Sequence, residues 1–386
     1  MLNRTVSVSN QKKIPIWTII AAAIANYFCS LIDHKIISFD NKYSVKSSKE
    51  VCTSTHSRSM GQKHSFKKNI VEKKGSRRHE GRVNGVVDDK KGNTVSGSED
   101  GTIVSWTSLG VRKQEWVVKS AVTRIAHDPI TNRVYAATRD GNVRSFLKRK
   151  ENESAEDGVA AIHTSRVTGL CNPRKDLICT GGRDNAVCTL DAETLEIRRR
   201  VVVPRNLVTD LCTIDHETIA QTSEDLTLRV WDVRKMDTRR PAQVFDGFQF
   251  FAIGVAADDD GRYLLTTSKG DNSKGCEARL FDRRKSGDGG SGLVRTLRGH
   301  TRSTTGCAFL PGRSDRAVTV SLDGTARLWE LAKGKCLGVI EGADDGAGLT
   351  CLANSKHRTS LSMSFGTESG EIRAVECVGG DRIRLN

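Results

Sequence analysis

Residues 318–329 read VTVSLDGTARLW, and this stretch decides the fold because similar stretches recur along the chain. The copy at residues 95–106, VSGSEDGTIVSW, keeps the Ser, the Asp-Gly pair and the final Trp. Each copy reads as two short, β-branched apolar strands joined by an Asp-Gly type of turn. Self-similarity at a regular interval predicts a repeat architecture.

Seven copies occur between residues 79 and 386, and their last residues lie 40 to 50 positions apart. A further apolar strand precedes each hairpin, so each unit has room for four strands. A ring of four-stranded sheets buries faces that a lone sheet leaves exposed, and we therefore expect an all-β, seven-bladed propeller. The seven last residues are Trp106, Phe146, Leu190, Trp231, Phe281, Trp329 and Val375.

The spacing S/T-x-x-x-D-x5-W, the pair Trp231-Asp232 and the pair Gly299-His300 resemble those of WD-repeat proteins over residues 79–386. In that family a His, a Ser or Thr, an Asp and a Trp form a hydrogen-bonded tetrad within a blade. The resemblance implies structural tetrads in units one and six, a partial one in unit three, and few members in units two, five and seven. The residues concerned are His79, Ser96, Asp100 and Trp106; His300, Thr319, Asp323 and Trp329; and His163, Thr180 and Asp184.

A His, a hydroxyl and an Asp also suggest a catalytic triad. Repetition in several units argues against this, because a nucleophile is needed once whereas a stabilising network is needed in each blade. The sequence has no Gly-rich phosphate loop and no H-E-x-x-H motif. The 11 cysteines never form C-x-x-C, which favours small buried side chains in a reducing compartment. We therefore expect no enzyme activity, cofactor, metal site or disulfide framework.

One rim of the ring is the expected surface for partner proteins. The residues just before each turn Asp lie there, together with two arginines that precede first strands. The alternative for each position is an ordinary solvated loop. The candidate partner-binding residues are Glu99, Arg139, Arg183, Glu224 and Leu322, with Arg82 and Arg166.

The ring must also close, because an unpaired strand edge invites association with other chains. The outer strand of the last unit comes either from the tail DRIRLN at 381–386 or from NIVEKK at 69–74, which would join the two ends. Of the two, we favour the tail.

The positive charge is concentrated before the propeller. Residues 1–78 hold 15 of the 61 Lys and Arg residues but only 4 of the 46 Asp and Glu residues, so 11 of the 15 net charges lie there. The remaining 308 residues carry a net +4, which does not suggest specific nucleic-acid binding. We expect residues 1–78 to form a largely disordered basic arm and residues 79–386 to form the propeller.

Two features of the arm compete as membrane signals. The apolar run IWTIIAAAIANYFCSLI at 16–32 has 17 residues, which is short for a spanning helix, yet it remains a possible anchor. The other feature, MGQKHS at 60–65, fits the N-myristoylation pattern if translation begins at Met60, with Gly61 as the acceptor. A basic patch is the second signal that a single myristoyl chain needs. That patch consists of Lys63, Lys67, Lys68, Lys73, Lys74, Arg77 and Arg78.

Residues 178–185, 203–235 and 275–285 resemble a ciliary subfamily of WD-repeat proteins whose members carry a short basic MG-x-x-x-S segment before the propeller. The resemblance implies a cytoplasmic scaffold for cilium assembly and intraflagellar transport, which works with small-GTPase regulators at the membrane of the ciliary base. A different class remains open. Trp231, Asp232 and Arg234 fit the W-D-x-R box of substrate receptors for cullin-based ubiquitin ligases.

Overall fold

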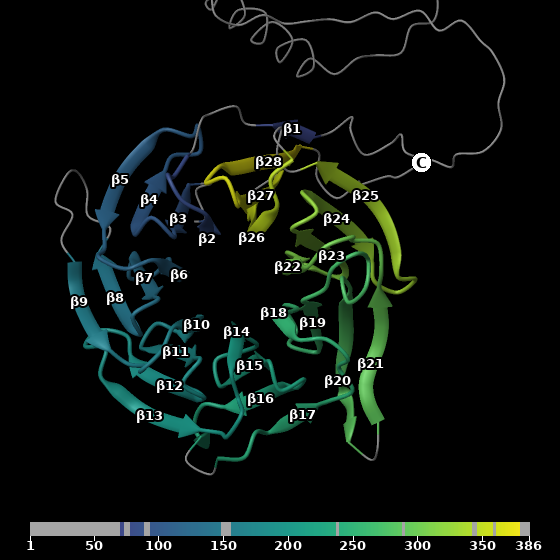
Figure 1. Ribbon diagram of the computed structural model, residues 1–386, viewed down its shortest axis with the longest axis horizontal. Helices are drawn as coiled ribbons and strands as arrows, with labels where there is room; N and C mark the ends of the chain where they lie inside the picture. Colours follow the sequence, from purple (N-terminus) through teal and green to yellow (C-terminus); the bar gives the residue numbers. More distant parts are fainter. Residues whose placement is uncertain are drawn as a thin grey trace, which may run out of the picture. The chain divides into compact units, whose positions relative to one another are not determined.

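The computed structural model describes residues 70–72, 78–88, 93–147, 156–236, 239–287, 290–341, 346–357 and 360–378. In this part of the chain, seven four-stranded antiparallel sheets stand around a common axis, as Figure 1 shows. The protein is an all-β, seven-bladed propeller, so the fold predicted from the repeat is confirmed.

The blades follow one another along the chain. Blades one and two are β2 (Val83–Asp88), β3 (Thr94–Ser98), β4 (Thr102–Trp106), β5 (Arg112–Val117), and β6 (Val122–Asp128), β7 (Arg133–Thr138), β8 (Asn142–Leu147), β9 (Glu156–Ala161). Blades three and four are β10 (Val167–Arg174), β11 (Leu177–Gly182), β12 (Ala186–Asp191), β13 (Ile197–Val202), and β14 (Val208–Thr213), β15 (Thr218–Ser223), β16 (Leu228–Asp232), β17 (Gln243–Phe245). Blades five and six are β18 (Ala252–Ala257), β19 (Tyr263–Ser268), β20 (Ala278–Gly287), β21 (Gly290–Leu297), and β22 (Thr304–Leu310), β23 (Arg313–Ser321), β24 (Thr325–Glu330), β25 (Lys335–Glu341). Blade seven is β26 (Leu349–His357), β27 (Ser360–Thr367), β28 (Ile372–Val378) and β1 (Ile70–Glu72).

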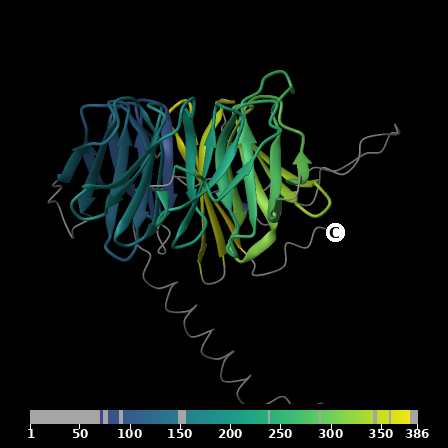
Figure 2. The same ribbon diagram turned by 90° about the horizontal axis from the view of Figure 1, so that it is seen from below.

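In each blade the first strand lies nearest the axis and the last described strand forms the outer edge (Figure 1). Seen from the side, the strands run between the two faces of the ring (Figure 2). The turns between second and third strands therefore all reach the same face as the segments that enter the first strands. This arrangement brings residues from seven separate repeats to one surface.

The last residue of each sequence copy has the same place in every blade. Trp106 pairs with Thr94, and Trp329 pairs with Ala317. Both tryptophans lie towards the open end of the hairpin that the second and third strands form, away from its turn. All seven last residues are at most 3% exposed, because each fills the space between its own blade and the preceding one around the ring. The alignment that predicted the ring thus corresponds to one packing position repeated seven times.

Side-chain hydrogen bonds also tie neighbouring inner strands together. Each donor is the second residue of an inner strand, and each acceptor is a backbone carbonyl of the following blade. Such bonds satisfy buried polar groups that would otherwise be left without partners. The pairs are Asn84 with Val122, Thr168 with Val208, Thr209 with Ala252, Thr305 with Leu349, and Thr350 with Val83. The last pair joins blade seven to blade one.

The preferred prediction for ring closure is wrong. The outer strand of blade seven is β1, which pairs antiparallel with β28 and places Ile70 opposite Cys377. The edge of β28 that residues 381–386 would need is therefore occupied, and the alternative at 69–74 supplies the strand. Joining the two ends of the ring covers an edge that would otherwise be open. The propeller thus includes residues upstream of position 79, where we expected it to begin.

Most of the basic arm, including 16–32, Met60 and Gly61, lies outside the described residues. No helix in the described ranges is long and apolar enough to cross a membrane. Eight cysteines in the described ranges, from Cys171 to Cys351, are free thiols, and four of them are buried. Burial raises the pKa of the Cys188 thiol to about 11, which keeps it protonated and unreactive at neutral pH.

Candidate functional site

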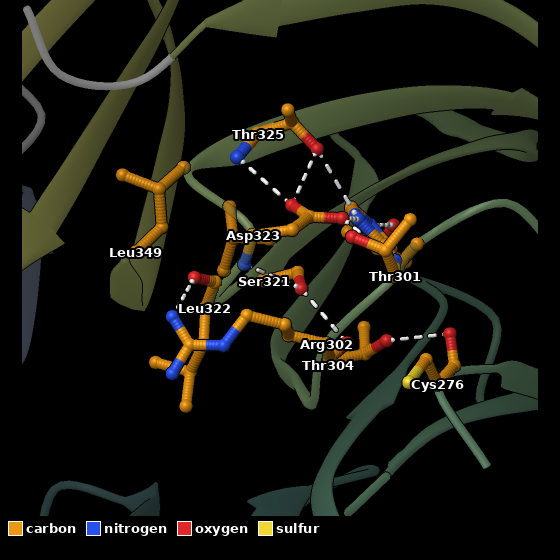
Figure 3. Close-up of polar contacts among 12 residues, drawn as sticks. Cys276, Thr301, Arg302, Thr304, Ser321, Leu322, Asp323, Thr325 and Leu349 are labelled. Carbon is orange, nitrogen blue, oxygen red and sulfur yellow. Dashed lines mark hydrogen bonds and ion pairs between the residues drawn. The ribbon is translucent and has the colours of Figure 1, made fainter. Parts of the chain in front are cut away.

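Blade six contains the complete tetrad. His300 Nε2 lies 2.8 Å from Thr319 Oγ1, and Trp329 Nε1 donates to the same oxygen at 2.8 Å. The other nitrogen of the imidazole, His300 Nδ1, lies 2.9 Å from Asp323 Oδ2. Figure 3 shows Asp323 held between Thr325 and Thr301, and the Thr301 N–H donates to the carboxylate at 3.0 Å. One imidazole thereby connects the entering loop, the turn and the third strand.

Blade one forms a variant of this chain. His79 Nε2 lies 2.7 Å from Ser96 Oγ, to which Trp106 Nε1 donates at 2.8 Å. His79 Nδ1 contacts Thr102 Oγ1 at 2.7 Å rather than Asp100, whose nearest oxygen is 3.5 Å away. Thr102 in turn donates to Asp100, so the carboxylate is one bond further from the imidazole. Burial lowers the pKa of His79, although Asp100 opposes this effect.

Blade three keeps the first part of the tetrad. His163 lies 2.9 Å from Thr180 through Nε2 and 2.8 Å from Asp184 through Nδ1. Leu190 occupies the Trp position and offers no indole N–H. Arg200 instead donates to Asp184 at 2.7 Å and fastens the outer strand β13 to the turn. His163, Arg200 and the backbone N–H groups of Thr164 and Ala186 together hold this carboxylate.

Blade four contains a polar chain that sequence reasoning missed. Gln221 takes the place of the Ser or Thr, accepts a hydrogen bond from Trp231 Nε1 at 2.6 Å, and donates to Asn206. Arg229 links Asn206 to Asp225, with contacts of 3.0 and 2.6 Å. The preserved Asp225 and Trp231 spacing was the available signal. The amides of Asn206 and Gln221 replace the imidazole and the hydroxyl, so the sequence pattern of His and Ser or Thr does not match this blade.

Blades two, five and seven use packing instead of this polar chain. The residues in the place of Thr319 are Ala136, Thr266 and Phe365. In blade five, Phe281 and Phe248 stack with ring centroids 5.3 Å apart, and the guanidinium of Arg279 lies over Phe248. Apolar contacts and a cation–π contact thus fill the space that the tetrad occupies elsewhere.

Hydrogen bonding determines the ionisation of the tetrad carboxylates. Burial alone would raise the pKa of Asp323, but bonds from His300, Thr325 and the Thr301 N–H hold it well below its usual range. The pKa of Asp184 is lowered in the same way by His163 and the Thr164 N–H. The hydroxyls of Ser96, Thr180 and Thr319 are fully buried, so none of them is accessible to a substrate. These hydrogen-bonded tetrads therefore stabilise the blades.

The predicted partner-binding residues lie on one face, which we call the rim. Seven equivalent residues precede the turns, and the backbone N–H of each donates to the carbonyl of the residue that enters the first strand, at 2.8 to 3.0 Å. The donors are Glu99, Arg139, Arg183, Glu224, Lys269, Leu322 and Glu368, and the acceptors are Arg82, Ala121, Arg166, Leu207, Phe251, Ser303 and Gly348. Sequence reasoning missed Lys269 and Glu368, because an insertion follows the first and Ser replaces the turn Asp after the second.

Several rim charges are paired between neighbouring blades. Arg139 contacts Glu99, and Arg183 forms a two-point contact with Glu224 at 2.7 and 3.2 Å. Arg82 lies 3.5 Å from Glu368. Leu322 has no charge to pair, and its carbonyl accepts a bond from Arg302 (Figure 3). The rim therefore presents a fixed pattern of paired charges rather than one continuous basic or acidic surface.

The W-D-x-R residues form a turn after β16. Arg234 donates to Asp232 at 2.9 Å and contacts Glu217 at 2.6 Å, while its side chain stays 52% exposed. Arg284 contacts Asp282 in the same way in blade five. Trp231 is fully buried and belongs to the Gln221 chain, so Arg234 is the most exposed residue of the box.

The seven four-stranded blades define a β-propeller, and two of its segments are similar to WD repeats. The sequence profile described as "WD domain, G-beta repeat" matches residues 73–107 and 291–330, which cover the tetrads of blades one and six. A stretch of 127 residues is 28% identical to nuclear distribution protein nudF of Emericella nidulans, covering 33% of this chain and 26% of that protein.

Two further relatives match shorter stretches. Zinc finger CCCH domain-containing protein 48 of Arabidopsis thaliana is 39% identical over 82 residues, which cover 21% of this chain and 15% of that protein. The tRNA (guanine-N(7)-)-methyltransferase non-catalytic subunit wdr4 of Dictyostelium discoideum is 34% identical over 65 residues, covering 17% and 12%. In each case the match spans less than a third of the relative's own length.

Proposed function

We propose that this protein is a non-enzymatic scaffold that binds other proteins through the rim. The observation that carries the proposal is the rim itself, where seven equivalent positions present exposed or half-exposed charged and apolar side chains on a rigid ring. Buried tetrad hydroxyls are consistent with a structural role for the His and Asp residues. One of the relatives, wdr4 of Dictyostelium discoideum, is named as a non-catalytic subunit, which also agrees with a supporting role.

A double variant tests the rim. Arg139→Ala with Arg183→Ala removes two of its charges, and we expect loss of the proteins that co-purify with the full chain. Arg112→Ala with Arg295→Ala is the matched control, because both of these arginines are exposed and lie on outer strands. If the rim variant retains every partner while its thermal unfolding is unchanged, the rim is not the binding surface.

The proposed cellular setting rests on resemblance. The segments at 178–185, 203–235 and 275–285 resemble WD repeat-containing protein 31, which implies a role in cilium assembly and intraflagellar transport with small-GTPase regulators. Co-purification from ciliated cells is the direct test. Recovery of intraflagellar-transport components or GTPase regulators supports this setting, whereas their absence from rim-dependent partners contradicts it.

The arm is the proposed membrane signal. Translation from Met60 would expose Gly61 to myristoylation, and the basic residues from Lys63 to Arg78 would attract anionic lipid at the ciliary base. Salt screens the second attraction within a Debye length of about 8 Å and leaves the acyl chain almost unaffected. Extraction of membranes with salt, for the wild type and for Gly61→Ala, together with mass spectrometry of the N-terminal peptide, separates this proposal from anchoring by 16–32. Salt-resistant binding by Gly61→Ala, with a peptide that starts at Met1, would favour the anchor.

A ubiquitin-ligase receptor is the second candidate, and the exposed Arg234 beside Asp232 favours it. The stretch Phe281-Asp282-Arg283-Arg284 matches the W-D-x-R pattern more loosely, with Phe in place of Trp. If the W-D-x-R box binds a cullin-ligase adaptor, Arg234→Ala should abolish adaptor capture, whereas Arg284→Ala should not. Failure of the wild-type chain to capture the adaptor would eliminate this candidate.

A further inference from the structure

Arg166 stands out among the charged residues of the rim. It enters the inner strand β10, and its side chain is half-buried. Its Nε is buried without a hydrogen-bond acceptor in the described part of the chain, and no carboxylate there forms an ion pair with the guanidinium. Leaving a buried polar or charged group without a partner costs free energy, which a bound ligand can recover.

The charges around Arg166 make this position more unfavourable for a lone cation. Burial lowers the pKa of the guanidinium, and Arg124, Arg139 and Arg82 lower it further, whereas Glu99 alone among the main contributors opposes them. The Glu99 carboxylate already contacts Arg139. The local field therefore favours an additional negative charge beside Arg166.

The neighbouring arginines have partners of their own. Arg124 reaches Asp210 at 3.2 Å and also donates to two backbone carbonyls. Arg183 is held by Glu224. Lys269 and Arg302 also lack an acidic partner in the described residues, but both are exposed, so water solvates their charges. Among the rim residues named above, Arg166 alone combines partial burial with a missing acidic partner in the described part of the chain.

Blades four to six contribute apolar side chains to the rim beside the charges of Glu224 and Lys269. Leu207, Phe251 and Leu322 belong to the rim positions of blades four, five and six, and Phe251 is 41% exposed. A polyanion such as a nucleic acid would meet paired carboxylates and apolar side chains here instead of a continuous basic surface. A peptide segment with a single acidic side chain instead matches the isolated charge of Arg166.

We propose that the rim binds an acidic peptide segment of a partner protein, whose carboxylate pairs with Arg166. This inference rests on the proposed rim function and specifies the chemistry of the partner. A two-point bond between guanidinium and carboxylate would also explain why Arg rather than Lys suits this position.

Peptide arrays test the proposal with the full chain as the probe. One array carries peptides of about a dozen residues with a single Asp, and a matched array carries Asn instead. We expect preferential binding to the Asp array. For a captured peptide, Arg166→Gln should weaken binding about tenfold or more, measured by fluorescence polarisation, and Arg166→Lys should restore part of the loss.

A double-substitution cycle identifies the contact. Exchange of Asp for Asn in the peptide and Arg166→Gln in the protein should each weaken binding, and together they should weaken it little further. Arg295→Gln, on the outer strand β21, is the control for the charge change and should leave binding unchanged.

Equal binding of the Asp and Asn arrays, or fully additive losses in the cycle, would overturn the proposal. Arg166-dependent binding of an oligonucleotide or an inositol polyphosphate, with no Asp peptide bound, would overturn it too. Either result would overturn only the acidic-peptide proposal, and not protein binding by the rim, if the Arg139→Ala, Arg183→Ala double variant still loses its partners. Retention of all partners by that double variant removes the rim function itself.

Discussion

Blades five and six are neighbours with the same strand order, yet they fill their interiors differently. Blade six links His300, Thr319 and Trp329 by hydrogen bonds, whereas blade five stacks Phe281 on Phe248. Trp329 and Phe281 are both 1% exposed. The comparison shows that a propeller blade requires a large buried side chain at this position, while the hydrogen bonds around it can be replaced by apolar packing.

The difference also explains which residues are lost together. A buried polar chain is favourable only when every member has its partner, so loss of one member leaves the others unsatisfied. Blade seven accordingly has Phe365 and Val375 in place of the hydroxyl and the indole, and blade two has Ala136 and Phe146. Blade three keeps three members after losing the Trp, because Arg200 supports its carboxylate.

The largest effect is expected from Phe281→Ala in blade five. The substitution removes a fully buried ring and its stacking partner's contact, so the free energy of unfolding should fall by about 3 to 5 kcal/mol. Urea unfolding followed by tryptophan fluorescence measures this change. Phe251→Ala, at an exposed position, is the control and should change stability by about 0.5 kcal/mol or less. Equal effects of the two substitutions would show that blade five does not depend on its aromatic stack.

Asp323→Ala in blade six should have a smaller effect, about 1 to 3 kcal/mol, because it leaves His300 and the Thr301 N–H without their acceptor. Asp260→Ala, in an exposed turn, serves as the control in the same unfolding measurement. A loss no larger than that of the control would mean that packing alone stabilises blade six, as in blade five.

The effect of Asp323→Ala should depend on pH. The pKa of Asp323 is lowered in the folded protein, so its stabilising contribution is complete above the unfolded value of 3.8 and is lost as the pH falls towards the folded value. Unfolding curves at several acidic pH values should show the gap between wild type and variant narrowing. A gap that stays constant below pH 3.8 would contradict the lowered pKa.

The smallest effect is expected in blade one. Burial lowers the pKa of His79 below 6.5, so the folded state binds its proton less readily than the unfolded state does. Stability should therefore be full above pH 6.5 and decline as the pH falls below it. His79→Gln should lack this part of the decline when thermal unfolding is compared across that range. If wild type and variant lose stability in parallel, His79 does not titrate as its burial requires.

The number and order of the blades are determined by the sequence alone. Each hairpin is local, and in blades two to seven the large residue at its end packs against the blade that precedes it in the chain, so seven copies of one pattern suffice to predict seven blades. The tetrads of blades one and six follow from the same local spacing. The amide chain of blade four did not, because Gln221 and Asn206 provide the same hydrogen bonds with different chemical groups.

Only the tertiary structure decided how the ring closes and which charges on the rim are satisfied. The pairing of Ile70 with Cys377 and the bond from Thr350 to Val83 join residues more than 250 positions apart. No local pattern marks such contacts, because curvature accumulated over all seven blades brings the two ends together. The isolation of Arg166 has the same origin. The charged residues around it come from separate blades. Among them, Arg124 already contacts the carboxylate of Asp210, and Arg139 already contacts that of Glu99.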